Sequence, residues 1–172
     1  MFPGGYAGGG ARYFPGVRGS GPRKYGNWRL LVLTRIDHVG IACRDLDRAI
    51  AFYESTFGLE VVSREVSTEQ GVREAMLRVA DAPAGASYVQ LLEPLAPDTP
   101  VGRFLARRGE GVHHVGYGVA DITAALAQIG ATGVRLIDAR PRHGSMGASI
   151  AFLHPADVGG VLTELVQSAG PG

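Results

Sequence analysis

Four polar residues stand among apolar neighbours at spacings that repeat along the chain. His38 and His114 are 76 positions apart (114 − 38 = 76), and Gln90 and Glu164 are 74 apart (164 − 90 = 74). Two imidazoles, an amide oxygen and a carboxylate form a donor set with one negative charge, which suits a divalent cation and leaves coordination positions open for a substrate. No thiolate is present to favour a structural zinc site. We therefore expect these four residues to bind one divalent metal ion.

The immediate neighbours of these residues predict where they point. Gln90 and Glu164 lie within the apolar runs VQL and TEL, and side chains alternate between the two faces of a strand, so each is expected on a concave inner face. Taken singly, a strand histidine is more often a hydrogen-bonded structural residue, and a strand Gln or Glu more often faces solvent. The matched positions in a repeat favour the metal site over these readings.

Glu74 is the candidate general base. It follows a turn at Gly71 and shares an alternating face with Val72 and Met76, so it is expected to point inward. Burial raises the pKa of a carboxyl group while a nearby cation lowers it, and the balance suits proton transfer near neutrality. The alternative is a glutamate on an edge strand that pairs with Arg73 or Arg78.

The other histidines fit the site less well. His113 is expected on the opposite face from His114 by strand alternation, which makes it a poor ligand. His143 is predicted in a loop, and His154 precedes a proline at the end of a strand.

An internal repeat organises these residues into two modules. The segment IDHVG at 36–40 returns as VHHVG at 112–116, and GASYVQLL at 85–92 returns as GGVLTELV at 159–166. The modules span about 34–94 and 112–167, each with a strand, a helix and three further strands. Related modules that meet by pseudo-twofold symmetry would bring the four polar residues together.

The periodicity and the capping residues predict the individual elements. The helices are expected from Asp45 to Gly58, over a linking segment at about 98–108, and from Asp121 to Gly130. The strands are expected near 34–43, 59–66, 72–80, 86–93, 112–119, 133–138, 147–153 and 159–167. The fold class is therefore α+β, with two tandem βαβββ modules forming a concave mixed sheet around one metal site.

Residues 1–29 differ in composition from the remainder. They are rich in Gly and Arg, lack periodicity, and are expected to be a disordered extension before a single domain at 30–172. A transit peptide or a weak anion-binding arm are the functional alternatives to a dispensable tail or an upstream start codon. Five of the 17 basic residues and none of the 16 acidic ones lie in this segment, which leaves the rest mildly acidic (12 − 16 = −4). No nucleic acid partner is therefore expected.

Cysteine usage and hydropathy bear on the compartment. Cys43 is the only cysteine, which rules out an intrachain disulfide and fits a reducing cytoplasm. No apolar run approaches the roughly 20 residues of a membrane helix, and the N-terminus lacks the apolar core of a signal peptide. We expect a soluble, cytoplasmic protein without a membrane partner.

The region from Leu33 to Val166 resembles the methylmalonyl-CoA epimerases of the vicinal oxygen chelate superfamily, which have the glyoxalase fold of paired βαβββ modules. The resemblance rests on the segments IDHVGIAC, EQGVREAML, SYVQLLEP, GVHHVGYGV, GSMG before IAFLHP, and GVLTELVQ. It implies that His38, Gln90, His114 and Glu164 bind the metal and that Glu74 is a catalytic base. It also implies that Gln70 and Ser145 contact the substrate carboxylate, although both also fit plain turn residues.

The resemblance implies an isomerase of propionyl-CoA metabolism that interconverts (2R)- and (2S)-methylmalonyl-CoA. The C2 proton lies between a thioester and a carboxylate, so its removal places charge on oxygens that a metal can stabilise. Return of the proton to the opposite face requires a second acid, for which Glu164 or a bound water is a candidate. Co²⁺ is the favoured ion, with Mn²⁺, Ni²⁺, Zn²⁺ or Mg²⁺ possible, and a homodimer is implied.

Three other members of the same superfamily are rivals. A glyoxalase-type isomerase usually has Glu where Gln90 stands, and a ring-opening dioxygenase uses two His and one carboxylate without a fourth side chain. A drug-sequestering protein of this fold generally lacks the metal ligands. Gln90 together with Glu74 favours the epimerase.

Overall fold

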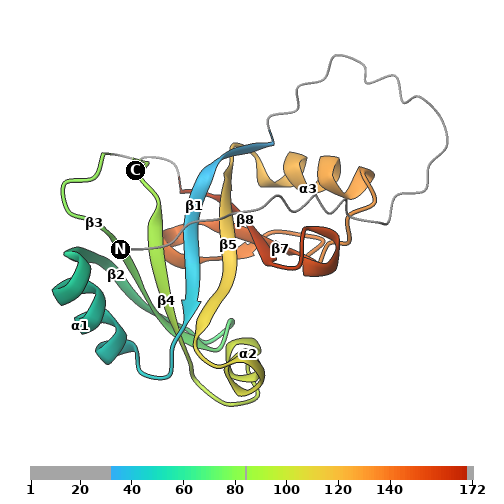
Figure 1. The fold of residues 1–172 in the computed structure, drawn as a ribbon. Coiled ribbons are helices and arrows are strands. Elements are labelled where there is room, and N and C mark those ends of the chain that lie inside the picture. Colours follow the sequence, from blue (N-terminus) through green and yellow to red (C-terminus); the bar gives the residue numbers. More distant parts are fainter. Residues whose placement is uncertain (1–31, 84, 170–172) are drawn as a thin grey trace, which may run out of the picture. The chain divides into compact units, whose positions relative to one another are not determined.

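The computed structural model describes residues 32–83 and 85–169, which fold as two consecutive βαβββ modules (Figure 1). The extension predicted over residues 1–29 lies outside the described residues. The first module consists of β1 (Leu33–Ala42), α1 (Leu46–Phe57), β2 (Leu59–Ser67), β3 (Val72–Val79) and β4 (Tyr88–Pro94). After α2 (Pro100–Arg108), the second module consists of β5 (Gly111–Val119), α3 (Ile122–Ala131), β6 (Arg142–His143), β7 (Ser149–Leu153) and β8 (Leu162–Gln167). The predicted fold class and module order are confirmed.

The predicted caps determine where the two module helices begin. The side chain of Asp45 accepts a hydrogen bond from the backbone N–H of Arg48, and that of Asp121 accepts one from Ala124. These contacts satisfy backbone donors that a helix N-terminus otherwise leaves free. Gly58 ends α1 with a φ of 66°, whereas α3 runs one residue past the predicted stop at Gly130.

The strand predicted near 133–138 is wrong. Leu136 makes only an isolated bridge with Leu153, and the strand beside β7 is the two-residue β6. The carboxylate of Asp138 accepts a hydrogen bond from the backbone N–H of Phe152 at 2.9 Å, so a side chain occupies a position where a ladder carbonyl would lie. His143, predicted in a loop, lies in the short strand β6 and is exposed.

The eight strands of the described region form one mixed sheet in the order β2-β3-β4-β1-β5-β8-β7-β6. β1 and β5 pair antiparallel at its centre, while β1 pairs in parallel with β4 and β5 with β8. The order of strands outward from the central pair is thus the same in both modules. The first strand of each module lies beside its last strand, as the four-residue prediction requires.

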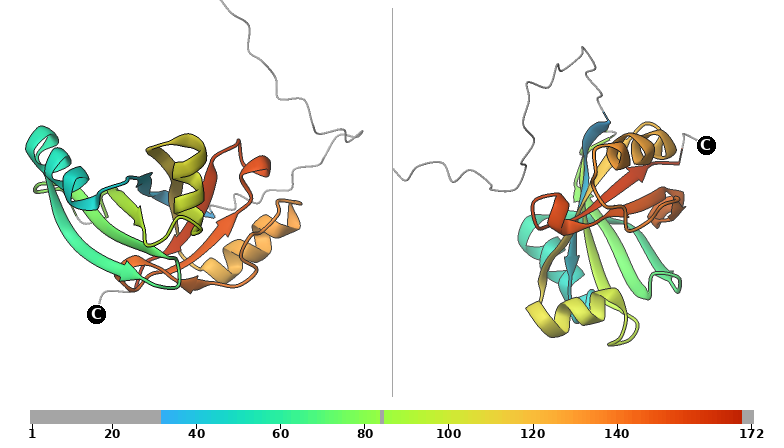
Figure 2. Two further views of the ribbon diagram at one scale, coloured as in Figure 1. Left: turned by 90° about the horizontal axis from the view of Figure 1, so that it is seen from below. Right: turned by 90° about the vertical axis from the view of Figure 1, so that its right-hand side faces the viewer.

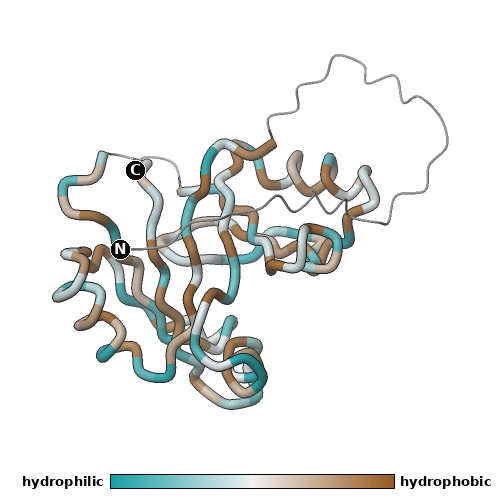
Figure 3. The backbone as a smooth tube through the Cα atoms, in the orientation of Figure 1, coloured by the Kyte–Doolittle hydropathy of each residue, from teal (hydrophilic) through white to brown (hydrophobic). Residues whose placement is uncertain are grey.

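The helices α1 and α3 pack on the outer side of the curved sheet, one on each half (Figure 2). Ile50 of α1 packs with Leu77 of β3 and Leu91 of β4, and α3 packs against Leu165 of β8. Hydrophobic and polar positions alternate along the central strands (Figure 3). Because alternation sends every second residue inward, the inner face receives Gln90 beside the outward Leu91.

The curvature brings the two ends of the sheet into contact across the inner face. In η1 (Ser145–Gly147), the hydroxyl of Ser145 donates to Glu74 on β3, and the backbone N–H of Met146 donates to Glu65 on β2. The side chain of Gln70 donates to the backbone carbonyl of His143 at 3.3 Å. The inner face is thus enclosed by residues of both modules. Among the described helices, none is long and apolar enough to cross a membrane.

Candidate metal centre

Three of the four predicted ligands converge at the centre of the inner face. The Nε2 atoms of His38 and His114 lie 2.9 Å apart, and Glu164 Oε2 lies 2.8 Å from the first and 3.3 Å from the second. All three side chains are buried, with exposed fractions of 3–4%. Two imidazoles and a carboxylate whose donor atoms lie within 4.8 Å of one another form a set able to hold a metal ion.

Two buried oxygen atoms in this centre have no hydrogen bond among the residues that the structure describes. They are Gln90 Oε1 and Glu164 Oε2, and the second remains unbonded although two imidazole nitrogens lie within 3.3 Å of it. The amide nitrogen of Gln90 donates to Glu74, which leaves its oxygen free to bind a cation. Since an unsatisfied buried oxygen is costly, these atoms fit a divalent ion as their common partner.

A glycine in the partner module makes room for each histidine ring. Gly40 pairs with His114 across the central strands, and Gly116 pairs with His38. A methyl group at Gly40 would lie 2.2 Å from His114 Cε1, and one at Gly116 would lie 2.4 Å from His38 Cε1. Gly40 and Gly116 are themselves repeat equivalents (116 − 40 = 76). The repeat therefore supplies both the rings and the space that they occupy.

The charge states of His38 and Glu164 favour a positive charge at this centre. Burial disfavours the charged form of His38, but its contacts with Asp37 and Glu164 outweigh this and raise its pKa to about 9. Burial likewise raises the pKa of Glu164, and its contacts with His114 and His38 outweigh it and lower the pKa to about 2. The centre thus keeps an anionic carboxylate in the interior, balanced by a positive charge that His38 carries when protonated and that a bound cation could supply in its place.

Glu74 lies beside this centre and is almost completely buried, with 2% of its surface exposed. Its Oε2 accepts a hydrogen bond from Gln90 Nε2 at 2.6 Å, and its Oε1 accepts one from Ser145 Oγ at 2.6 Å. Burial raises the pKa of Glu74, and the charge of Glu65 adds to this, while the hydrogen bonds lower it, with a net increase. Arg73 pairs with Asp47 instead, so the predicted alternative of a surface ion pair does not apply.

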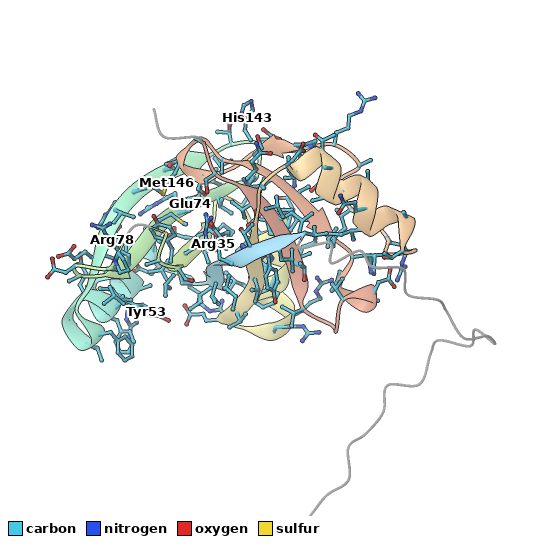
Figure 4. The ribbon with its side chains drawn as sticks, turned by 90° about the horizontal axis from the view of Figure 1, so that it is seen from above. Arg35, Tyr53, Glu74, Arg78, His143 and Met146 are labelled. Atoms are coloured by element: carbon cyan, nitrogen blue, oxygen red, sulfur yellow. The ribbon has the colours of Figure 1, made fainter. Side chains whose placement is uncertain are left out.

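A pocket of about 310 Å³ opens beside the centre and is lined by residues from both modules. His38, Gln90 and Glu164 contribute to its wall, and Met76, Ser145 and Met146 lie around them. Figure 4 shows Glu74 and Met146 near one another, whereas Tyr53 of α1 lies at the edge of the molecule. The pocket can therefore present a small substrate to the candidate ligands.

The structure does not bring Gln70 to this pocket. Gln70 lines a second pocket of about 210 Å³, together with His113, His114 and Phe152. Of the two predicted substrate contacts, Ser145 thus lies beside Glu74 and Gln70 does not.

The expectation that His113 points away from His114 is wrong. The Nδ1 atoms of the two rings lie 3.0 Å apart, because the strand is irregular at this point and simple alternation fails. Asp37 was not among the predicted site residues; it is 5% exposed and contacts His38. An aspartate directly before a candidate ligand was the signal that could have identified it.

Comparison with known proteins supports the predicted resemblance. Residues 37–152 match the family described as the glyoxalase/bleomycin resistance protein/dioxygenase superfamily. A mitochondrial methylmalonyl-CoA epimerase from Bos taurus is 35% identical over 137 residues, which cover 79% of this chain and 75% of the relative. An ethylmalonyl-CoA/methylmalonyl-CoA epimerase from Cereibacter sphaeroides is 34% identical over 138 residues, which cover 79% and 99%.

A solved structure of similar fold extends this comparison. It is a methylmalonyl-CoA epimerase in complex with methylmalonyl-CoA and NH4+, with 58% sequence identity and a TM-score of 0.77. The match covers 80% of this chain and 96% of that chain. The predicted fold and the predicted resemblance to epimerases are thereby confirmed.

Proposed function

This chain belongs to the glyoxalase/bleomycin resistance protein/dioxygenase superfamily, and on that premise we propose that it is a methylmalonyl-CoA epimerase, interconverting the 2R and 2S epimers of its substrate. The observation that carries the proposal is the position of Glu74. A buried carboxylate with a raised pKa lies beside the candidate metal ligands, held by residues of both modules. This arrangement suits abstraction of a proton next to a carbonyl group.

His38, Gln90, His114 and Glu164 would hold the metal ion. The free oxygen of Gln90 and the convergence of the other three donors support this assignment. A bound divalent cation would supply positive charge that stabilises the enolate formed when the C2 proton leaves. The amide group of Gln90 would then serve twice, since its oxygen, which has no hydrogen-bond partner among the described residues, would bind the ion while its nitrogen donates to Glu74.

Glu74 would remove the C2 proton of the bound acyl-CoA. Burial moves the pKa of Glu74 upward, towards neutral pH. A base that must accept and then return a proton works best when its pKa is close to the working pH. Ser145 and Gln90 each bond one of its oxygens, so the carboxylate cannot rotate freely and its approach to C2 is defined. Burial excludes competing water from the enolate.

Return of the proton to the opposite face requires a second acid. Glu164 lies on β8 and Glu74 on β3, in opposite halves of the sheet, so a substrate bound between them would have one of these carboxyl groups on each side. Glu164 Oε2 is, however, already placed between two imidazoles. This position supports the role of Glu164 as a metal ligand more than its role as the second acid. A bound water is the alternative second acid.

The substrate would lie in the pocket beside the centre, where Ser145 can exchange its hydrogen bond with Glu74 for one with the substrate carboxylate. Gln70 would reach the substrate only from the second pocket. We further propose Co²⁺ as the metal, although the mixed donor set also accepts Mn²⁺, Ni²⁺, Zn²⁺ and Mg²⁺. A homodimer, a cytoplasmic location and a single domain at 30–172 complete the proposal, and light scattering tests the dimer.

Loss of the C2 proton signal of methylmalonyl-CoA in D₂O tests the function directly. We would compare the metal-free protein, the protein with Co²⁺, and Glu74→Gln with Co²⁺. Exchange should require the metal and fall by about 10²- to 10⁴-fold in the variant, the usual contribution of a positioned base. Absence of exchange with every divalent ion would refute the epimerase and favour a glyoxalase-type or sequestering role.

A further inference from the structure

The two central strands each contain a β-bulge at the residue that precedes a histidine of the metal centre. In β1, Ile36 and His38 oppose the consecutive residues Tyr117 and Gly116, so Asp37 is the extra residue. In β5, Val112 and His114 oppose the consecutive residues Ile41 and Gly40, so His113 is the extra residue. Asp37 and His113 are repeat equivalents (113 − 37 = 76). Bulges of this kind redirect side chains, and they are common beside active sites.

Each bulge turns its extra residue towards the ring that follows. Asp37 Oδ1 lies 3.2 Å from His38 Nδ1, and His113 Nδ1 lies 3.0 Å from His114 Nδ1. In both rings the Nε2 atom faces the centre and the Nδ1 atom faces the bulged residue. The bulges therefore place one partner behind each ring.

The hydrogen-bond chemistry determines what these partners do. A ring nitrogen that binds a metal carries no proton, so the Nε2 ligands require Nδ1 to be protonated in both rings. An ionised Asp37 can accept a hydrogen bond but cannot donate one, and it thus selects the tautomer of His38 that is protonated at Nδ1. His113 must likewise accept at its Nδ1, which requires a neutral ring with its own proton on Nε2.

We propose that Asp37 and His113 are positioning residues that fix the tautomer and orientation of the two histidine ligands. The inference rests on the metal centre of the proposed function and extends it to two residues outside the donor set. The two partners are chemically unequal, because a carboxylate is an anionic acceptor and an imidazole is a neutral one. His38 is therefore the more electron-rich ligand, and loss of Asp37 has the larger effect on metal affinity.

The surroundings of both partners hold them in place. The guanidinium of Arg35 contacts the other oxygen of Asp37 and also bonds Ser168. The ring of Phe104, on α2, packs edge-on against His113 with a centroid distance of 5.0 Å. Neither partner can leave its ring without breaking these contacts.

Binding of Co²⁺ to the purified full chain tests the inference, measured by calorimetry and by the visible absorption of the bound ion. Asp37→Ala removes the acceptor, and Asp37→Asn retains an acceptor oxygen without the charge. His113→Phe keeps a ring against Phe104 without an acceptor, and His113→Asn restores an acceptor near the position of Nδ1. Asp157→Asn is the matched control, because Asp157 also pairs with an arginine, Arg135, but contacts no ligand.

Loss of Asp37 should weaken Co²⁺ binding by about 10- to 100-fold, and His113→Phe by about 10-fold. Asp37→Asn should fall between wild type and Asp37→Ala, while His113→Asn and Asp157→Asn should bind as wild type does. In the Zn²⁺-loaded protein, ¹⁵N NMR should show both ligand rings protonated at Nδ1.

Several results would overturn the inference alone. They are wild-type affinity in both Asp37→Ala and His113→Phe, equal weakness of His113→Asn and His113→Phe, or Nδ1 unprotonated in either ring. Failure of the wild-type chain to bind any divalent ion would instead overturn the metal centre itself. Epimerase activity is measured separately, so the two failures are distinguishable.

Discussion

Substitution of Gly40 by Ala tests whether the close packing between the modules positions the metal centre. The added methyl group would lie 2.2 Å from Cε1, 2.5 Å from Nδ1 and 2.7 Å from Nε2 of His114. Carbon atoms in contact are about 3.5 Å apart or more, so the ring must move by about 1.3 Å (3.5 − 2.2 = 1.3). Gly40 has no left-handed φ, and the strain is therefore steric rather than conformational.

A displacement of this size is large for a metal ligand. Metal–nitrogen distances are tolerated within about 0.2 Å, so His114 would lose its coordination. Removal of a supporting partner alone costs about 10- to 100-fold in affinity, and loss of the ligand should reach at least the upper figure. We expect Co²⁺ to bind about 100-fold more weakly, or about 2.8 kcal/mol in binding free energy. Overpacking should also lower the free energy of unfolding by about 1–3 kcal/mol.

The assay is calorimetric titration of Co²⁺ into the folded variant, with circular dichroism to verify the fold. Gly130→Ala is the control, since its methyl group would lie 3.4 Å from Leu136 Cδ1, close to ordinary contact, and touch no ligand. Gly116→Ala should reproduce the effect through His38. Wild-type affinity in Gly40→Ala, with an unchanged fold, would show that His114 is not held as a ligand in this geometry and would refute the reasoning.

Two further predictions concern stability. Asp45→Ala removes the cap of α1 and should lower the free energy of unfolding by about 1 kcal/mol, seen as a lower urea midpoint with an unchanged slope; an unaltered midpoint would contradict the capping role. The hydrogen bonds from Arg135 lower the pKa of Asp157 to about 2, so the pair stabilises the fold above the ordinary value of 3.8 and loses this contribution as the pH falls towards 2. Between pH 5 and 2, the free energy of unfolding should therefore decrease less steeply with falling pH for Asp157→Asn than for wild type. The same pH dependence in both proteins would count against this coupling.

The residues that form the centre were predictable because a repeat carries information that single positions lack. His38 and His114 occupy equivalent positions in two copies of one module, and pairing of β1 with β5 brings the copies together. The alternation of strand residues then places Gln90 inside and Leu91 outside. Helix boundaries followed from caps such as Asp45, which act through contacts three residues away and need no knowledge of the tertiary structure.

Features that depend on contacts between distant segments were not predictable. The bulges at Asp37 and His113 shift the register between two strands that lie far apart in the sequence, and a rule of simple alternation assigns His113 to the wrong face. The segment 133–138 has a strand-like composition, but the side chain of Asp138, and not a backbone carbonyl, accepts the hydrogen bond from the backbone N–H of Phe152. The hydrogen bond between Ser145 and Glu74 depends on the curvature of the sheet, which no local pattern encodes.

The last strands of the two modules differ at one equivalent position, which is Gln90 in β4 and Glu164 in β8. This difference determines the charge of the donor set. Two copies of the first module, paired as the modules are here, would surround a cation with two imidazoles and two neutral amides. Two copies of the second would surround it with two imidazoles and two carboxylates, enough to neutralise a divalent ion fully. If an ion binds as proposed, the covalent joining of unlike halves would give the donor set an intermediate charge that neither self-paired half can reach. It would also leave a divalent ion with a residual positive charge to attract an anionic substrate.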